Sequence, residues 1–304
     1  MSILVGVNPG QRSASVLHLA AMLARSIKTD LIVAAVLPQS WSPLRHNADG
    51  EWRTYMSDSA DIVLDHAASV IVGVKATFVQ HTARSAHRGL LELIEEHKPD
   101  LVVVGSSSAG AIGQIALGST NDALLHASPV PVAIAPRGFR AADTATVTRI
   151  TAAYGGTDAA ADVVLGAAGV AQSIGASLRV ASFAVTRGSV TAGVGLEAEQ
   201  DVADEWARTI EEHVRSLLAE VTALPRVPEL DGAVVGMGDT WAHALEDVEW
   251  DAGDVLVVGS STLGPLARVF IGSHATKVVR NSPVPAIIVP RRAAEELVEA
   301  AEEA

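Results

Sequence analysis

The stretch 103–137, VVGSSSAGAIGQIALGSTNDALLHASPVPVAIAPR, recurs without a gap as residues 257–291, VVGSSTLGPLARVFIGSHATKVVRNSPVPAIIVPR. The two stretches are identical at 15 of 35 aligned positions. Most identical positions hold glycine, serine or proline, which shape the backbone, rather than the apolar residues of a core. A repeat of this kind predicts two copies of one domain.

The length and composition agree with this division. A chain of 304 residues suits two domains of about 150 residues each. Hydrophobic residues make up 49% of the chain but aromatic residues only 4%, so Ala, Val, Leu and Ile must build the core. Such a composition favours helices packed on a buried parallel sheet. The absence of cysteine excludes disulfides and thiolate metal sites.

Charge and hydropathy exclude further classes of protein. A net charge of −13 argues against a dedicated nucleic-acid binder, because neutralising phosphates needs clustered Lys and Arg. The chain opens on a strand-like run without a basic leader, and no apolar stretch reaches the about 18 residues of a membrane span. The ten His residues are scattered, so no metal site is predicted. We expect a soluble, cytoplasmic protein with no membrane or nucleic-acid partner.

Aliphatic runs alternate with amphipathic stretches in both halves of the sequence, which is typical of βαβ units in a parallel sheet. Strands are predicted at 3–7, 31–37, 75–80, 101–105 and 131–135, and at 149–154, 178–184, 232–236, 254–259 and 285–289. Helices are predicted near 11–27, 55–72, 84–97 and 118–127, and near 158–174, 198–223, 239–249 and 272–281. We therefore place the first repeat at 1–138, a linker at 139–147, the second repeat at 148–292 and an acidic tail, read as a solvated helical end, at 293–304.

Prolines mark the fifth strand of each repeat as an edge strand. Pro129 and Pro131, and likewise Pro283 and Pro285, end a helix and open a strand, because proline cannot donate to a sheet ladder. Two exposed edges in one chain are a liability. Pairing of the two edges about a pseudo-two-fold axis is the predicted solution.

A glycine and serine frame follows the fourth strand of each repeat. Gly105 to Ser108 leave this strand, and Gly118 and Ser119 open the next helix. Glycine admits a ligand close to the backbone, and a helix N-terminus offers free N–H groups and a positive dipole end, so the frame suits an anion. The residues alone leave open a second interpretation, in which the glycine makes a turn and the serine caps a helix.

The frame resembles that of the universal stress protein family in its tandem form. The family pattern is Gly, two residues, Gly, nine residues, then Gly-Ser or Gly-Thr. Here it is Gly105-x2-Ser108-x9-Gly118-Ser119, and again Gly259-x2-Thr262-x9-Gly272-Ser273. The flanking LVVVGS and SPVP segments and the opening ILVGVNPG also match, so the resemblance covers nearly the whole chain.

The resemblance implies two doubly wound α/β domains with five parallel strands in the order 3-2-1-4-5, of the Rossmann-like, adenine-nucleotide-hydrolase-like kind. It implies dimerisation through the fifth strand, and an ATP site, with Mg only as a companion of ATP, at the ends of the first and fourth strands. In the first repeat the implied site is Asn8, Val36, Gly105, Ser106, Ser107, Ser108, Gly118 and Ser119. In the second repeat it is Phe183, Gly259, Ser260, Thr262, Gly272 and Ser273.

The sequence departs from the family pattern at two places. Ser108 and Thr262 replace the second glycine, where a side chain crowds a phosphate. The acidic residue usual after the first strand is Asn8 in one repeat and Gly155 in the other. Because Gly155 has no side chain to bond a ligand, the first repeat is the better candidate site.

Three functions remain open at this point. The first is a nucleotide-responsive regulatory module with no or slow turnover, and the second is a nucleotide-free dimerisation scaffold. The third is an ATP-hydrolysing or adenylating enzyme, since residues 154–158 are similar to a loop of adenylating pyrophosphatases, although both serines of that loop are missing. No nucleophile, base or carboxylate pair is readable, so no catalytic residue is predicted.

Overall fold

A computed structural model describes residues 2–11, 13–39, 46–185, 196–260 and 272–303. Contacts divide the chain into two compact units, Met1–Thr146 and Val147–Ala304. The division falls inside the segment predicted as the linker. Part of that segment packs on the first unit, because Arg25 donates hydrogen bonds to the carbonyls of Ala142 and Ala145.

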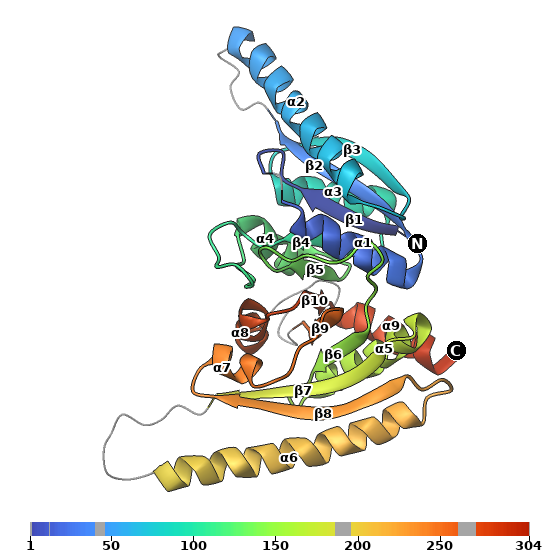
Figure 1. Ribbon diagram of the computed structural model, residues 1–304, viewed down its shortest axis with the longest axis vertical. Coiled ribbons are helices and arrows are strands. Elements are labelled where there is room, and N and C mark those ends of the chain that lie inside the picture. Colours follow the sequence, from blue (N-terminus) through green and yellow to red (C-terminus); the bar gives the residue numbers. More distant parts are fainter. Residues whose placement is uncertain (1, 12, 40–45, 186–195, 261–271, 304) are drawn as a thin grey trace. The chain divides into compact units, whose positions relative to one another are not determined.

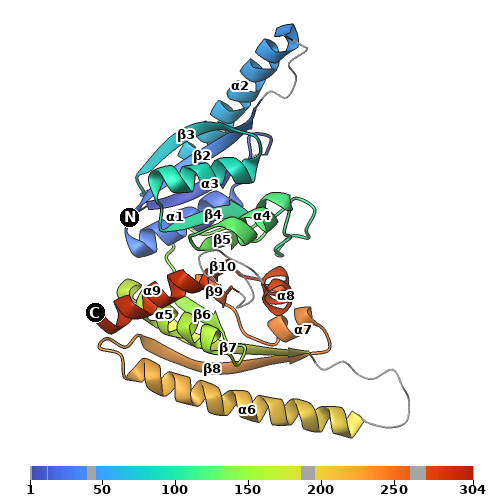
Figure 2. The ribbon, with the colours of Figure 1, turned by 180° about the vertical axis from the view of Figure 1, so that it is seen from behind.

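The first unit is a parallel sheet with helices on both faces (Figures 1 and 2). Its elements are β1 (Ser2–Val7), α1 (Ser15–Ile27), β2 (Asp30–Pro38), α2 (His46–Val70), β3 (Ala76–Ala83), α3 (Ala86–His97), β4 (Leu101–Gly105), α4 (Ser119–Ala127) and β5 (Val132–Ala135). The strands lie in the order β3-β2-β1-β4-β5, and every neighbouring pair is parallel. Helices α1 and α2 cover one face, and α3 and α4 cover the other.

The second unit repeats this arrangement. Its elements are β6 (Arg149–Ala153), α5 (Asp158–Ile174), β7 (Ser177–Val185), α6 (Leu196–Thr222), β8 (Glu229–Gly238), α7 (Trp241–Glu246), β9 (Asp254–Gly259), α8 (Ser273–Asn281), β10 (Ala286–Val289) and α9 (Arg291–Glu303). The strands lie in the order β8-β7-β6-β9-β10, again all parallel. The predicted fold class, two repeated α/β domains with parallel sheets, is confirmed.

Three helices differ in length from the prediction, and the first of them, α1, begins at Ser15 rather than near residue 11. Helix α2 begins at His46 rather than near residue 55, although its first turns contain Asn, Asp and Gly, which are typical of loops. Near this start the Thr54 hydroxyl donates a hydrogen bond to the Gly50 carbonyl. Helix α7 ends at Glu246 rather than near residue 249. There the Asp247 carboxylate accepts the N–H of Met237 at the end of β8, at 3.0 Å.

The C-terminal segment, predicted as a solvated helical end, is a helix with one packed side. It forms α9, whose Ala294 and Ala301 are buried. They face α5 at two glycines, and a Cβ atom added at Gly169 would lie 2.6 Å from the Cβ of Ala301. The run of Glu residues hides this apolar stripe in the sequence, but the spacing of Ala294, Leu297 and Ala301 is helical.

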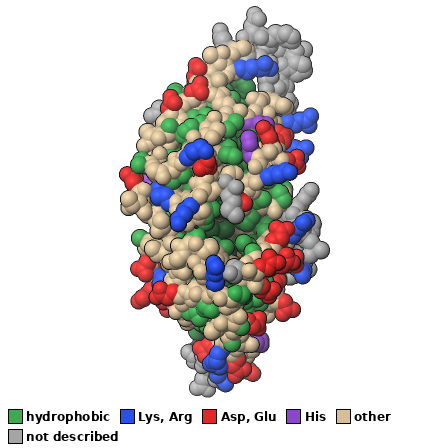
Figure 3. Space-filling model, turned by 90° about the vertical axis from the view of Figure 1, so that its right-hand side faces the viewer, with side chains coloured by type: hydrophobic (Ala, Val, Ile, Leu, Met, Phe, Trp, Pro, Cys, Tyr) green, Lys and Arg blue, Asp and Glu red, His purple; other side chains and the backbone are tan. Residues whose placement is uncertain are grey.

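The surface carries charges of both signs. On the face drawn in Figure 3, Asp and Glu side chains lie among Lys and Arg side chains. No helix in the described part of the chain has both the length and the apolar character needed to cross a bilayer. Among the same described residues, no group of three or more His, Asp and Glu side chains is placed to hold a metal ion.

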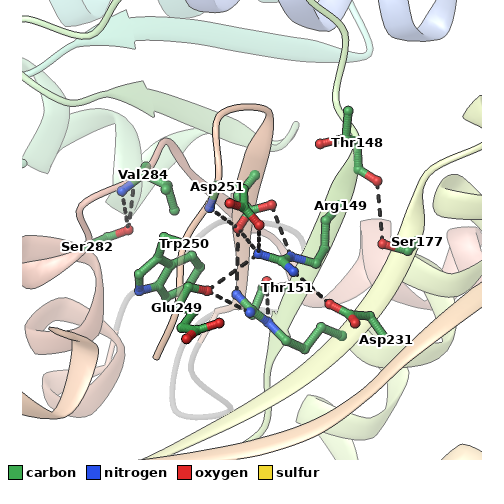
Figure 4. Close-up of polar contacts among 12 residues, drawn as sticks. Thr148, Arg149, Thr151, Ser177, Asp231, Glu249, Trp250, Asp251, Ser282 and Val284 are labelled. Carbon is green, nitrogen blue, oxygen red and sulfur yellow. Dashed lines mark hydrogen bonds and ion pairs between the residues drawn. The ribbon is translucent and has the colours of Figure 1, made fainter. Parts of the chain in front are cut away.

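A buried ion pair joins the amino ends of β6 and β9 in the second unit (Figure 4). Arg149 donates to the Asp254 carboxylate through Nε at 3.0 Å and Nη2 at 2.6 Å, and the Asp254 side chain is 0% exposed. This hydrogen bond raises the pKa of Arg149 above its ordinary value. Arg179 is also buried, and its guanidinium lies 4.9 Å from the centre of the Trp250 ring. The fully buried Asp254 carboxylate is thus the shared counter-charge of Arg149 and Arg179.

Removing this carboxylate is expected to destabilise the second unit. Asp254→Asn leaves Arg149 and Arg179 without their buried counter-charge, so the free energy of unfolding should fall by about 3 kcal/mol. Urea denaturation measures the change. The control is Asp231→Asn, which removes a carboxylate that also pairs with Arg149 but is 44% exposed, and should cost under about 1 kcal/mol. Equal losses in the two variants would contradict the assigned role of Asp254.

Candidate functional site

A pocket of about 380 Å³ opens at the carboxyl ends of the strands in the first unit. The ends of β1, β2 and β4 and the starts of α1, α3 and α4 form its walls. Its volume lies in the range of small-molecule sites, about 300–1,000 Å³. All of the residues predicted for the first repeat line this one pocket: Asn8, Val36, Gly105, Ser106, Ser107, Ser108, Gly118 and Ser119.

The lining divides into apolar and polar groups from different elements. The apolar side chains of Val7, Val36, Ala86 and Leu90 come from β1, β2 and α3. The hydroxyl and amide groups come from the loop after β1, from the loop after β4 and from the start of α4. Such a lining suits a ligand that combines an apolar ring with an anionic group. Val36 is packed closely, since a Cβ atom at Gly89 would lie 2.5 Å from its Cγ1.

Three helices begin at the pocket without a side-chain cap. Their N-cap residues are Ala14 for α1, Ser85 for α3 and Gly118 for α4, and none accepts a hydrogen bond from its helix through its side chain. The Ser85 hydroxyl instead lies 3.2 Å from Nδ1 of His87. The first N–H groups of a helix have no partner within the helix and carry partial positive charge. The pocket therefore presents backbone donors suited to an anion.

The loop after β4 is held closed by its own serines. The Ser106 hydroxyl accepts the N–H of Ala116 at 2.8 Å, and the N–H of Ser107 donates to the Ala116 carbonyl at 2.8 Å. Ser106 thus uses its hydroxyl to shape the loop. Within the described part of the chain, the hydroxyls of Ser108 and Ser119 have no partner and remain for a ligand.

Asn121 is a site residue that the sequence did not reveal. Its side chain is buried and its Nδ2 donates to the Gly105 carbonyl at 3.0 Å, which ties the start of α4 to the end of β4. The second repeat has Ala275 at the matching position, so the duplication gave no signal there.

Ser108 and Asn8, where the first repeat departs from the family pattern, both line the pocket. Among described residues other than glycine, only Lys28 and Lys98 have positive φ, so the backbone at Ser108 does not require glycine. The Asn8 Oδ1 accepts the N–H of Gly10 at 3.0 Å. This bond leaves the Asn8 amide nitrogen as a donor in the lining of the pocket.

Comparisons with known proteins agree with this geometry. The universal stress protein family matches residues 1–136 and 146–290. The chain belongs to the universal stress protein family. A universal stress protein of Mycobacterium tuberculosis H37Rv is 36% identical over 296 residues, which cover 95% of this chain and 100% of that protein.

Solved structures of universal stress proteins share the fold. The crystal structure of one from Archaeoglobus fulgidus has a TM-score of 0.61 and 22% identity, covering 95% of this chain and 98% of its own. A putative universal stress protein from Pseudomonas aeruginosa has a TM-score of 0.58 and 18% identity, covering 99% and 97%. Helix α9 of the present universal stress protein lies beyond the family match, which ends at residue 290.

The second unit of this universal stress protein places its glycines and Ser273 as the first unit does, but it bonds Ser260 differently from Ser106. Gly259 ends β9, Gly272 is the N-cap of α8 and Ser273 begins that helix. Ser260 is buried, and its hydroxyl accepts the N–H of Arg291 at 3.1 Å. Phe183 lies on β7 and is half-buried. Thr262 lies outside the described residues.

The role of Ser106 in shaping the loop gives a direct prediction. Ser106→Ala removes the acceptor of the Ala116 N–H, so hydrogen exchange at that amide should become about 10-fold faster. Exchange measured by NMR checks the change. Ser108→Ala is the matched control, because the Ser108 hydroxyl accepts no loop amide among the described residues. Unchanged exchange in Ser106→Ala would show that the hydroxyl does not hold the loop.

Proposed function

We propose that this universal stress protein binds an adenine nucleotide, foremost ATP, in its first unit. In this proposal it acts as a cytoplasmic, nucleotide-responsive regulatory module with no or slow turnover. One observation carries the proposal: three helices without side-chain caps begin at a single pocket that is lined by Gly105–Ser108 and by Gly118 and Ser119.

The polar side of the pocket supports a phosphate group. The N–H groups at the start of α4, behind the N-cap Gly118, have no competing side-chain acceptor. The free hydroxyls of Ser108 and Ser119 add donors beside them. Among the described lining residues there is no Lys or Arg, so there the phosphates would be held by backbone dipoles and hydroxyls.

The apolar side supports a purine ring. Val36, Ala86 and Leu90 provide packing for a flat ring, and Asn8 offers an amide donor beside them. Binding sites for small molecules commonly combine an apolar lining with a few polar groups that set orientation. The family resemblance implies an adenine near Val36, and the apolar side of the lining supports this expectation.

The lining favours binding over turnover. The described lining residues include no Asp, Glu, His, Lys or Arg side chain, and so offer neither a general base nor a carboxylate for Mg²⁺. Mg²⁺ would enter bound to the phosphates of ATP. The pocket is open and the helices that begin at it have no side-chain caps. This also favours a nucleotide-binding module over a nucleotide-free scaffold. Pairing of the two repeats through their fifth strands and homodimer formation stay predictions.

Calorimetric titration with ATP tests the proposal. The wild-type chain should bind ATP, and Gly118→Glu should weaken binding by about 100-fold or more, because a carboxylate at the N-cap of α4 occupies and repels the anion site. A Cβ atom at this position would lie 3.2 Å from the Ser107 Cβ, so the change needs only a small local shift.

Gln114→Glu is the matched control, since it adds the same charge to the loop at an exposed residue outside the lining. It should bind ATP as the wild type does. No heat from wild-type protein at millimolar ATP would overturn the proposed function. Steady release of ADP or pyrophosphate in the presence of Mg²⁺ would overturn the absence of turnover.

A further inference from the structure

The second unit carries an aromatic pair where the first unit has its pocket. Ser85 and Thr240 are the N-caps of α3 and α7, so Trp241 corresponds to Ala86. Gly118 and Gly272 are the N-caps of α4 and α8, so His274 corresponds to Thr120. Both Ala86 and Thr120 line the pocket of the first unit. The second unit therefore has large rings at two positions that border an open space in the first.

These two rings touch each other. Trp241 and His274 lie edge to face, with 5.5 Å between ring centroids and an interplanar angle of 82°. The Lys277 ammonium, also on α8, lies 5.7 Å from the centre of the Trp241 ring. Edge-to-face pairs and cation–π contacts are both attractive. The side chains thus connect α7 to α8 across the place that the first unit leaves open for a ligand.

The helix starts of the second unit are also satisfied from within. The Thr157 hydroxyl accepts the N–H of Ala160 at the start of α5, at 3.3 Å. The Thr240 hydroxyl accepts the N–H of His243 at the start of α7, at 3.2 Å. The corresponding N-caps of the first unit, Ala14 and Ser85, make no such bond. Two of the three helix starts that lack a side-chain cap in the first unit are therefore capped in the second.

Strand register identifies one further replacement. Leu31 pairs with Ile3 and Leu178 pairs with Ile150, so Phe183 stands in the place of Val36. The Phe183 ring packs closely on its surroundings, since a Cβ atom at Gly236 would lie 3.1 Å from its Cδ1. Trp241 and Phe183 are half-buried and His274 is exposed, so these larger rings take up space at the border of the second unit rather than in its interior.

We infer that Trp241 and His274 close the second site, so that one chain binds one nucleotide, in the first unit. This inference rests on the proposed function, since it counts the sites for the same ligand. It assigns the two repeats different roles, because the first repeat binds and the second fills its own cleft.

Equilibrium dialysis with ATP counts the sites. The wild-type chain should bind one ATP. Trp241→Ala combined with His274→Thr restores small residues at both positions and should add a second, weaker site, because Gly155 lacks the amide that Asn8 supplies. The control Trp52→Ala removes an exposed tryptophan of α2 and should still bind one ATP.

The reciprocal exchange tests the same pair without relying on a gain of binding. Ala86→Trp combined with Thr120→His should weaken ATP binding in the first unit by about 100-fold, as bulky side chains fill the pocket. Circular dichroism and urea denaturation verify that each variant is folded.

The outcomes separate this inference from the proposed function. Two ATP bound to the wild type, with one retained in Gly118→Glu, would overturn the inference and leave ATP binding intact. A double variant Trp241→Ala, His274→Thr that is folded and still binds one ATP would overturn closure by this pair, as would full affinity in the reciprocal variant. No ATP bound to the wild type would overturn the proposed function itself.

Discussion

Parallel pairing of the first strand with two neighbours at once is the constraint on which each unit depends. In the first unit β1 pairs with β2 on one side and with β4 on the other, and their registers bring Val7, Val36 and Gly105 to the same edge of the sheet. The chain must then leave this edge in opposite directions, which separates the helices that follow. A crevice between those helices is the geometric result. The glycines, serines and helix starts become a site only because this pairing places them together.

The sequence predicted the parts of the site that the duplication repeats. Gly105, Gly118 and Ser119 were found because the second copy carries the same residues, and the structure places them at one pocket. Asn121 was missed because the second copy has Ala275 there. Serine is a common N-cap residue, yet the Ser85 hydroxyl lies beside the His87 ring and does not cap α3. The residue type alone does not predict which of these two bonds a serine makes. The packing of helix α9, predicted only as a solvated helical end, was missed because its many Glu residues obscure the alanine stripe that packs on α5.

The two units share one fold but differ in whether side chains cap the first N–H groups of their helices. A threonine cap contributes about 1 kcal/mol to a helix, so the caps at Thr157 and Thr240 stabilise the second unit. The first unit forgoes these contributions at Ala14 and Ser85 and keeps its N–H groups free. Its helix starts are left for a ligand to satisfy, and a ligand that binds only the folded state would return that stability. The buried ion pair of Arg149 and Asp254 lies at the other end of the second unit's strands, away from these differences.

The contact between α5 and α9 bears on what counts as one domain of this chain. Gly166 and Gly169 have no side chains, and Leu297 and Ala301 of α9 fill the space above them. A shortened chain that ends where the family match ends would expose this strip of backbone and small side chains to water. The shortest second unit with this surface of α5 covered therefore extends beyond residue 290, where the family match ends. The C-terminal boundary of this unit is set by the surface of α5 that α9 covers.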